Sequence, residues 1–251
     1  MIKKHIFIIG GQRCGTTYLY GVLDSHPEIE LAKPVRPEPK FFLNEDSFKK
    51  GKEFYERKYF SSLLPTIKVI GEKGTSYVEY PIVAERIKSF YPEAKIIVIL
   101  RNPVERAISN YFFSVENGLE TRTIEEVFLT TKKAPILTKE ISVSPFAYLE
   151  RGIYSNYLPA FLNQFNNNLK VIFFEKLFSD SDIFEYIYKF VGVESSFISD
   201  KTNLKLNQSN LRQTVNVGIE IYEKLYQYYQ PHNKKLEQLL GYNINWQHDK
   251  I

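Results

Sequence analysis

Cysteine, methionine and tryptophan are almost absent from this sequence of 251 residues, which contains one of each. The single cysteine, Cys14, excludes an intrachain disulfide and a cysteine-rich zinc site. No apolar run is long enough to span a membrane, and the short one near residue 1 leads into two glycines rather than a small-residue cleavage site. We therefore expect a cytoplasmic protein without a transmembrane segment.

A strong excess of charge is also missing. Lysine and arginine number 33 against 29 aspartates and glutamates, so the formal net charge is +4. This balance lacks the dense basic stripe of a nucleic-acid-binding protein, although it suits an anionic ligand. None of the four histidines pairs with another at a metal-ligand spacing, so we expect no metal cofactor. Without linkers or repeats, residues 1–251 are expected to form a single domain; the sequence leaves the oligomeric state open.

Strand and helix patterns alternate along the chain. Apolar runs predict strands at 5–10, 68–71, 95–100 and 169–174, and helices at 16–25, 81–91, 103–116, 153–166, 180–192 and 216–240. This alternation favours an α/β fold with a central parallel sheet flanked by helices. Ligands of such sheets bind where the strands end, and these ends are expected at Gly10–Thr17, Glu72–Ser76, Arg101–Asn102 and Glu175.

The loop after the first predicted strand has the length and glycine frame of a phosphate-binding loop, so the expected fold is P-loop NTPase-like. It reads Gly10-Gly11-Gln12-Arg13-Cys14-Gly15-Thr16-Thr17. Its amides and the following helix N-terminus can cradle an anion. Thr16 stands where a nucleotide triphosphatase has its lysine, which disfavours a kinase or ATPase. A glycine-rich turn that only packs strand on helix is the simpler alternative.

A second anion signal follows the strand 95–100. Arg101 stands at the expected strand end, and Ser109 lies two turns into the next helix. Arginine suits bidentate contact with phosphate, although an ion pair with Glu105 would be a purely structural use. Together with the first loop, Arg101 suggests a nucleoside ligand with a phosphate at each end.

These two segments resemble the donor-binding elements of sulfotransferases. GGQRCGTTYLYGVLDSHP is similar to their 5′-phosphosulfate loop, and KIIVILRNPVERAISNYFFS to their 3′-phosphate element. The similarity continues through EPKFF, GEK, RGIY and YQPHNKK to Trp246, and is greatest with the heparan sulfate glucosaminyl 3-O-sulfotransferase branch. The resemblance implies a sulfotransferase that uses 3′-phosphoadenosine 5′-phosphosulfate (PAPS), releases 3′-phosphoadenosine 5′-phosphate (PAP) and sulfates a hydroxyl acceptor.

The resemblance also implies roles for individual residues. Glu38 corresponds to the catalytic base, and Lys73 and Arg13 lie beside the reacting group. The expected donor contacts are Gly11, Gln12, Arg13, Cys14, Gly15, Thr16, Thr17, Arg101 and Ser109, with Asn207, Ser209 and Arg212 as further candidates. Candidate acceptor contacts are Arg36, Lys40, Tyr77, Arg151 and Tyr154.

The sequence departs from the family pattern at three positions. Arg13 replaces the usual loop lysine, Lys40 replaces a histidine two residues after the base, and Leu43 stands where the family has an aspartate. Arginine keeps the positive charge but does not give up its proton.

The departures leave alternatives open. Glu38 could be solvated in a proline-rich loop, and His26 is a second candidate base. The acceptor could be a saccharide, a glycolipid or a small metabolite. A nucleotide kinase with a degenerate loop and a non-catalytic binding module are the rival functions.

Overall fold

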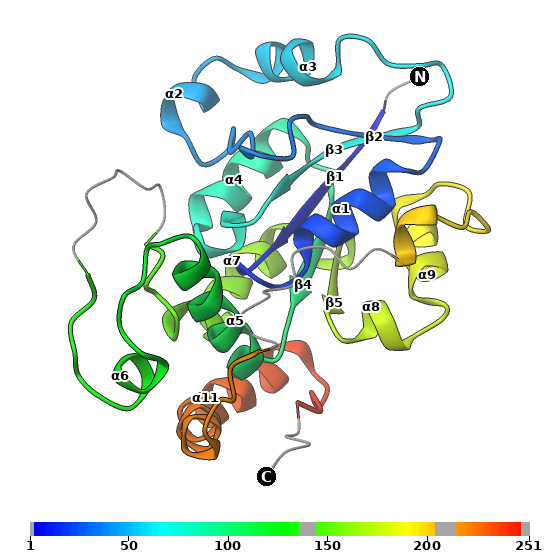
Figure 1. Cartoon of the computed structure of the whole chain (residues 1–251). Coiled ribbons are helices and arrows are strands. Elements are labelled where there is room, and N and C mark those ends of the chain that lie inside the picture. Colours follow the sequence, from blue (N-terminus) through cyan, green and yellow to red (C-terminus); the bar gives the residue numbers. More distant parts are fainter. Residues whose placement is uncertain (1–2, 136–143, 204–213, 247–251) are drawn as a thin grey trace. The chain divides into compact units, whose positions relative to one another are not determined.

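The computed structural model describes residues 3–135, 144–203 and 214–246 (Figure 1). They divide into two compact units. The first comprises residues 3–100 and 157–203, and the second comprises residues 101–135, 144–156 and 214–246.

A parallel sheet forms the centre of the first unit. Within the described residues it has five strands in the order β2-β3-β1-β4-β5, and every neighbouring pair is parallel. The strands are β1 (Lys4–Gly10), β2 (Ile29–Leu31), β3 (Val69–Gly74), β4 (Lys95–Leu100) and β5 (Leu169–Phe173). The apolar runs of β1 and β4 are almost completely buried, as expected for strands covered on both faces. The predicted α/β fold is thus confirmed.

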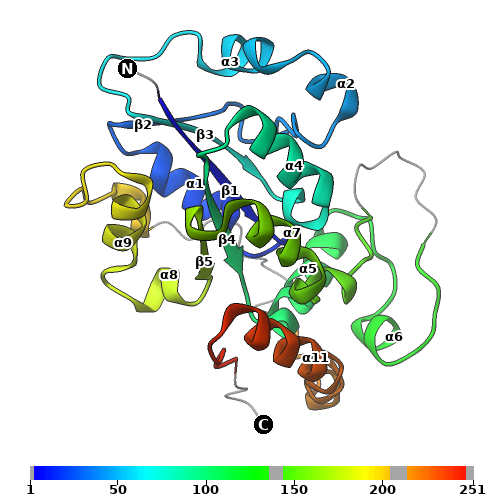
Figure 2. The ribbon, with the colours of Figure 1, turned by 180° about the vertical axis from the view of Figure 1, so that it is seen from behind.

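Helices cover both faces of this sheet. The helices are α1 (Thr16–Asp24), α2 (Glu45–Phe48), α3 (Lys52–Phe60), α4 (Pro81–Phe90), α7 (Tyr154–Phe165, in this unit from residue 157), α8 (Lys176–Ser179) and α9 (Ile183–Val191). Short 3-10 helices span Tyr77–Glu79, Asn166–Asn168 and Asp200–Asn203. Views from opposite sides show α1 on one face and α4 with α7 on the other (Figures 1 and 2). The chain crosses from β1 to β2 in one direction and from β3 to β4 in the other, so right-handed crossovers place α1 and α4 on opposite faces.

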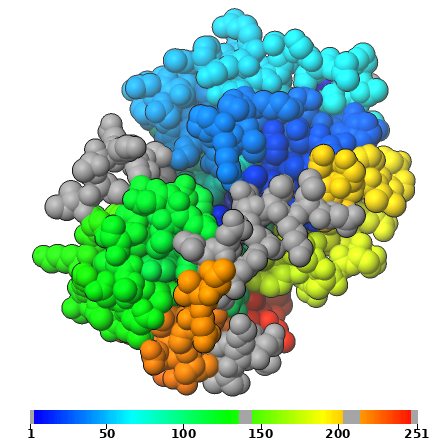
Figure 3. Space-filling view, viewed as in Figure 1, coloured from blue at the N-terminus to red at the C-terminus, as the bar shows by residue number. Residues whose placement is uncertain are grey.

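An aromatic cluster joins the segment after β2 to the sheet. Phe41 and Phe42 are buried, and Phe42 packs edge-on against Phe7 of β1 and Tyr55 of α3 at ring distances of 5.2 Å. The chain from α2 to α3 forms a continuous outer surface of this unit (Figure 3). Residues just before Phe41 are therefore anchored close to the sheet.

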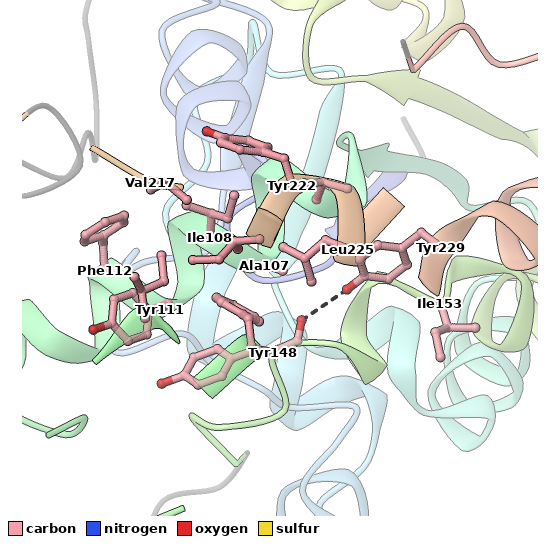
Figure 4. Packing of buried hydrophobic residues seen from close by; sticks show 14 residues of the cluster. Ala107, Ile108, Tyr111, Phe112, Tyr148, Ile153, Val217, Tyr222, Leu225 and Tyr229 are labelled. Carbon is pink, nitrogen blue, oxygen red and sulfur yellow. Dashed lines mark hydrogen bonds between the residues drawn. The ribbon is translucent and has the colours of Figure 1, made fainter. Parts of the chain in front are cut away.

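The second unit is helical in its described part. It contains α5 (Pro103–Glu116), α6 (Ile124–Phe128), α11 (Ile219–Leu240) and the 3-10 helix Glu150–Gly152. Figure 4 shows its core, in which Tyr229 donates a hydrogen bond to the Tyr148 carbonyl at 3.3 Å. An added Cβ on Gly152 would approach the Tyr229 ring to 2.7 Å, so this position has no room for a side chain.

Two of the elements that differ from the sequence predictions have a clear physical cause. The strand predicted at 68–71 continues as β3 to Gly74, because its backbone stays paired with β1 up to Ile9. Glu72 and Lys73 therefore lie inside the strand rather than beyond its end. The helix predicted at 180–192 begins only at Ile183, because the Asp180 side chain accepts the amide of Asp182 and forms a turn.

Candidate active site

The glycine loop connects β1 to α1. Gly15 adopts φ +91°, and an added Cβ there would approach the Phe174 ring to 2.5 Å, so only glycine fits. The amide of Cys14 donates to the Gly11 carbonyl at 3.1 Å and tightens the turn. Helix α1 has no acidic residue in its first turn, so its own sequence places no carboxylate at its positive N-terminal end. This loop has the form of an anion site.

Lys73 reaches from β3 toward this loop. It pairs with Ile8 in the sheet, so it lies close to the end of β1. Its side chain is only 3% exposed. The Lys73 ammonium donates to Glu38 Oε1 at 2.6 Å and to Thr17 Oγ1 at 3.3 Å. One buried cation therefore connects the glycine loop to the candidate base.

Glu38 is held by a second group of donors from the end of β3. The Thr75 amide donates to Glu38 Oε2 at 3.0 Å, and the Thr75 hydroxyl donates to Oε1. The same hydroxyl lies 3.2 Å from the hydroxyl of Thr16. With a side chain that is 12% exposed, Glu38 does not match the alternative of a solvated loop residue.

Thr75 was not singled out by the sequence, although it lies in the segment expected at a strand end. No motif marks a threonine two residues after a lysine. Its importance follows from the register of β3, which ends at Gly74 and places the next amide and hydroxyl beside Glu38.

Lys33, Arg36 and Lys40 lie near Glu38 in the sequence, but none of them is buried as Lys73 is. Lys33 forms ion pairs with Glu30 at 2.6 Å and Asp24 at 3.2 Å. Arg36 is exposed and Lys40 is half-buried. Of these three, Arg36 and Lys40 remain candidates for acceptor contact.

Tyr77 lies in the core. It has no exposed surface, and its hydroxyl donates to Glu72 and accepts the amide of Phe42 at 3.1 Å. This placement gives Tyr77 a supporting position behind the site rather than a surface that an acceptor could reach.

Both ring nitrogens of His26 are engaged by main-chain groups. Its ring Nδ1 accepts the amide of Glu28 at 3.1 Å, so Nε2 carries the proton and donates to the Glu194 carbonyl at 2.9 Å. Both ring nitrogens are thus used in holding main chain, which does not suit a catalytic base.

The second anion element belongs to the second unit. Asn102 caps α5 by accepting the amide of Val104 at 3.0 Å, and its side-chain amide donates to Tyr226 at 3.0 Å. Arg101 precedes this cap and is half-buried, whereas Ser109 is buried on α5. The cap fixes the direction in which the chain leaves Arg101.

Two further candidates lie near Arg101 in the same unit. The Tyr154 hydroxyl donates to the Arg101 carbonyl at 2.8 Å, and its ring packs on Trp246 at 5.9 Å. Tyr154 and Arg151 are both buried. The remaining donor candidates, Asn207, Ser209 and Arg212, lie outside the described residues.

Two features are absent from the described residues. No group of three or more His, Cys, Asp or Glu side chains is placed to hold a metal ion. In the same residues, no helix combines the length and apolarity needed to cross a bilayer.

Comparison with known families decides the kind of enzyme. The family described as "Sulfotransferase domain" matches residues 3–238. The chain belongs to this family. The resemblance drawn from the two anion elements is thereby confirmed, and the molecule is a sulfotransferase-domain enzyme, of a family whose donor is PAPS.

Two curated relatives of this sulfotransferase are named for heparan sulfate. The chain is 26% identical over 260 residues to the bifunctional heparan sulfate N-deacetylase/N-sulfotransferase 1 of Xenopus laevis, covering 94% of this chain and 29% of that protein. It is also 26% identical over 263 residues to the human heparan sulfate glucosamine 3-O-sulfotransferase 3B1, covering 95% of this chain and 64% of that one. The chain thus spans less than two thirds of either relative.

Solved structures share the fold. A sulfotransferase from Alicyclobacillus acidocaldarius matches with a TM-score of 0.76 and 23% identity, over 97% of this chain and 98% of that one. The mouse sulfotransferase SULT7A1, solved in complex with PAP, matches with a TM-score of 0.53 and 17% identity, over 95% of this chain and 86% of that one.

Proposed function

We propose that this sulfotransferase moves the sulfuryl group of PAPS to a hydroxyl of a saccharide or glycolipid, with Glu38 as the base. The observation that supports this most strongly is the Lys73 ammonium, which bonds Glu38 at 2.6 Å and Thr17 of the glycine loop at 3.3 Å. A base and a donor-binding loop joined by one buried cation suit an acceptor hydroxyl that meets a sulfuryl group between them.

The chemistry is an in-line displacement. The acceptor oxygen forms a bond to sulfur while the bond from sulfur to the bridging oxygen of PAPS breaks, and PAP leaves with that electron pair. Glu38 takes the proton of the acceptor hydroxyl. Negative charge grows on the leaving phosphate, so Lys73, Arg13 and the N-terminus of α1 stabilise the transition state. Arg13 acts here by charge alone, because its guanidinium does not release a proton.

The donor is held in this proposal at both of its ends. Residues 11–17 bind the 5′-phosphosulfate through amides and the hydroxyls of Thr16 and Thr17. Arg101 and Ser109 bind the 3′-phosphate, and Asn207, Ser209 and Arg212 are carried as adenosine contacts. The family match runs across both compact units, which supports one sulfotransferase domain as the functional body.

The acceptor is proposed from the relatives, both of which are named for heparan sulfate. Arg36 and Lys40 border Glu38 in sequence and would meet an anionic saccharide. A small metabolite remains the second acceptor class. The proposed location is cytoplasmic, with no metal and no nucleic acid as partners.

Calorimetric titration with PAP tests the donor site. The wild type should bind PAP in the micromolar range both with and without Mg²⁺, and Arg101→Ala should lose this binding. Binding of ATP only in the presence of Mg²⁺ would instead support the kinase alternative.

Turnover separates an enzyme from a binding module. Formation of PAP from PAPS should be measured with heparosan, a glucosaminide and a simple phenol as acceptors, and also with water alone. Glu38→Gln should retain PAP affinity and lower turnover about 100- to 10,000-fold, as expected for loss of a general base. A wild type that binds PAP and turns over none of these would favour the non-catalytic binding module.

A further inference from the structure

A buried carboxylic acid lies directly beside Lys73 on β3. Successive residues of a strand face opposite sides of the sheet, so Glu72 points away from the side that Lys73 serves. Glu72 has no exposed surface. Its Oε1 accepts the hydroxyl of Tyr77, and the hydroxyl of Tyr55 also favours its charged form. A fully buried acid is costly even with such partners and calls for a reason.

The Glu72 and Tyr77 side chains hold the main chain that follows Glu38. Tyr77 connects Glu72 to the main chain of Phe42, because its hydroxyl donates to Glu72 and accepts the Phe42 amide at 3.1 Å. The amide of Phe41 also favours the charged form of Glu72 and lowers its pKa, against the larger raising effect of burial. Two consecutive amides thus face this pair, three and four residues after Glu38.

The segment between Glu38 and these amides is strained. Lys40 adopts φ +48°, a left-handed backbone conformation that is unfavourable for residues other than glycine. Such a conformation persists where its surroundings fix it on both sides. Here Glu38 is bonded to Lys73 and Thr75 on one side, and Phe42 to Tyr77 on the other.

Gly74 makes room for this arrangement. An added Cβ on Gly74 would approach the Tyr77 ring to 2.3 Å. The absence of a side chain at the last position of β3 therefore lets Tyr77 lie against the strand with its hydroxyl directed at Glu72.

We propose that Glu72 and Tyr77 are positioning residues for sulfuryl transfer, which fix the Glu38–Phe42 segment so that the Glu38 carboxylate stays at Lys73 and Thr75. The proposal rests on the proposed role of Glu38. Neither residue touches the donor or the acceptor; both act through the main chain of Phe42.

The structural half of the proposal is tested without any activity. Hydrogen exchange of the peptide that covers residues 38–43 should be followed by mass spectrometry in wild type and Tyr77→Phe. Loss of the bond to the Phe42 amide should accelerate exchange in this peptide. Tyr111→Phe is the matched control, because it also removes a buried hydroxyl that bonds main chain, at 2.9 Å to the Arg122 carbonyl in the second unit. Unchanged exchange in Tyr77→Phe would overturn the proposal.

The catalytic half is tested by turnover of PAPS with water as the acceptor, which needs no identified substrate. Tyr77→Phe should lower kcat about 10- to 100-fold, as expected for a misplaced catalytic group, with the KM for PAPS and the affinity for PAP unchanged. In a Glu38→Gln background the same substitution should cost nothing further. An equal fall of kcat in both backgrounds would show a general structural effect and refute the positioning role.

Replacement of Glu72 supplies a second variant pair. Glu72→Gln keeps an oxygen that can accept from Tyr77 and should retain most of kcat, whereas Glu72→Leu should behave like Tyr77→Phe. If the two Glu72 variants have equal kcat, the acceptor oxygen is not what matters and the proposal fails. Wild type that does not bind PAP would refute the proposed function by itself, and hydrogen exchange would still decide the role of Tyr77.

Discussion

Neighbouring side chains on β3 experience opposite environments. Lys73 is buried with Glu38 as its counter-ion, whereas Glu72 is buried among aromatic residues and bonds the hydroxyl of Tyr77. Burial raises the pKa of Glu72 from 4.5 to about 7. The difference arises from the alternation of the strand, which sends adjacent residues to different sides of one sheet.

This raised pKa gives a prediction for stability against pH. An acid whose pKa is higher in the folded state takes up a proton on folding, so its contribution is present below about pH 4.5 and is lost as pH rises through about 7. Between about pH 5 and about pH 8, wild type should therefore lose up to about 3 kcal/mol of unfolding free energy relative to Glu72→Gln. Urea unfolding of both proteins at the two pH values measures this.

His5 changes the unfolding free energy with pH in the opposite direction to Glu72. It is present in both wild type and Glu72→Gln. Burial, assisted by Lys52, lowers the pKa of His5 to about 3, so its contribution is lost as pH falls below 6.5. Because this effect cancels in the difference between wild type and Glu72→Gln, it does not disturb the comparison. Parallel stability curves for the two proteins would contradict the prediction.

Gly15 gives a second prediction at this scale. Alanine there must adopt φ +91° and meets the Phe174 ring, so Gly15→Ala should lose both stability and PAP affinity. Gly51→Ala is the matched control, because Gly51 has φ +85° and nothing within 4 Å of an added Cβ. The control should cost about 1 kcal/mol and leave PAP binding intact. Thermal unfolding and calorimetry measure the two effects, and equal PAP affinity in both variants would argue against the loop as the donor site.

At the scale of elements, the sequence predicts some strands better than others. The apolar runs of β1 and β4 identify them directly, whereas β2 has three residues and is too short for a pattern. The charged residues Glu72 and Lys73 interrupt the apolar pattern of β3, so the pattern does not predict the second half of this strand. Helix α3 contains only two buried residues and so shows little periodicity. These elements owe their structure to tertiary packing rather than to local pattern.

The site follows the same division. Arg101 is found from its place at the end of an apolar strand, whereas Glu38 and Lys73 are found by family resemblance, because motifs record side chains that recur at fixed spacing. Thr75 and Tyr77 depend on where β3 ends and what faces it, which a single sequence does not express.

The cap of α5 carries a prediction for an element. Asn102 accepts the Val104 amide at 3.0 Å and directly follows Arg101. Asn102→Ala should cost about 1 kcal/mol of stability, the usual effect of a lost N-cap, and should weaken PAP binding because Arg101 loses its fixed direction. Asn117→Ala, at the other end of the same helix, removes only an exposed bond to the Phe113 carbonyl and should change neither quantity. Unaltered PAP affinity in Asn102→Ala would show that the cap of α5 does not contribute to the donor site.

At the scale of the whole molecule, the single tryptophan offers a measurement. Trp246 belongs to the second unit, where its indole packs on Tyr154. The proposed function assigns PAP contacts to residues of both units, so under this proposal PAP should stabilise both of them. At a PAP concentration of about 100 Kd, unfolding followed by Trp246 fluorescence and by far-ultraviolet circular dichroism should each gain about 2.7 kcal/mol. A gain in circular dichroism alone would mean that PAP binds the first unit without Arg101.

The strand order has a consequence for how the chain acquires its structure during synthesis. β1 is synthesised first but pairs only with β3 and β4. Lys4 therefore cannot pair until Val69 has been synthesised, and Ile6 cannot pair with β4 until Lys95 has been synthesised. Every pairing in this parallel sheet joins distant parts of the chain, and such topologies fold slowly. The glycine loop after β1 therefore leaves the ribosome early, and the strand that carries Lys73 follows it only some sixty residues later. Until then the apolar residues of β1 have no partner strand, which exposes the growing chain to aggregation during this interval.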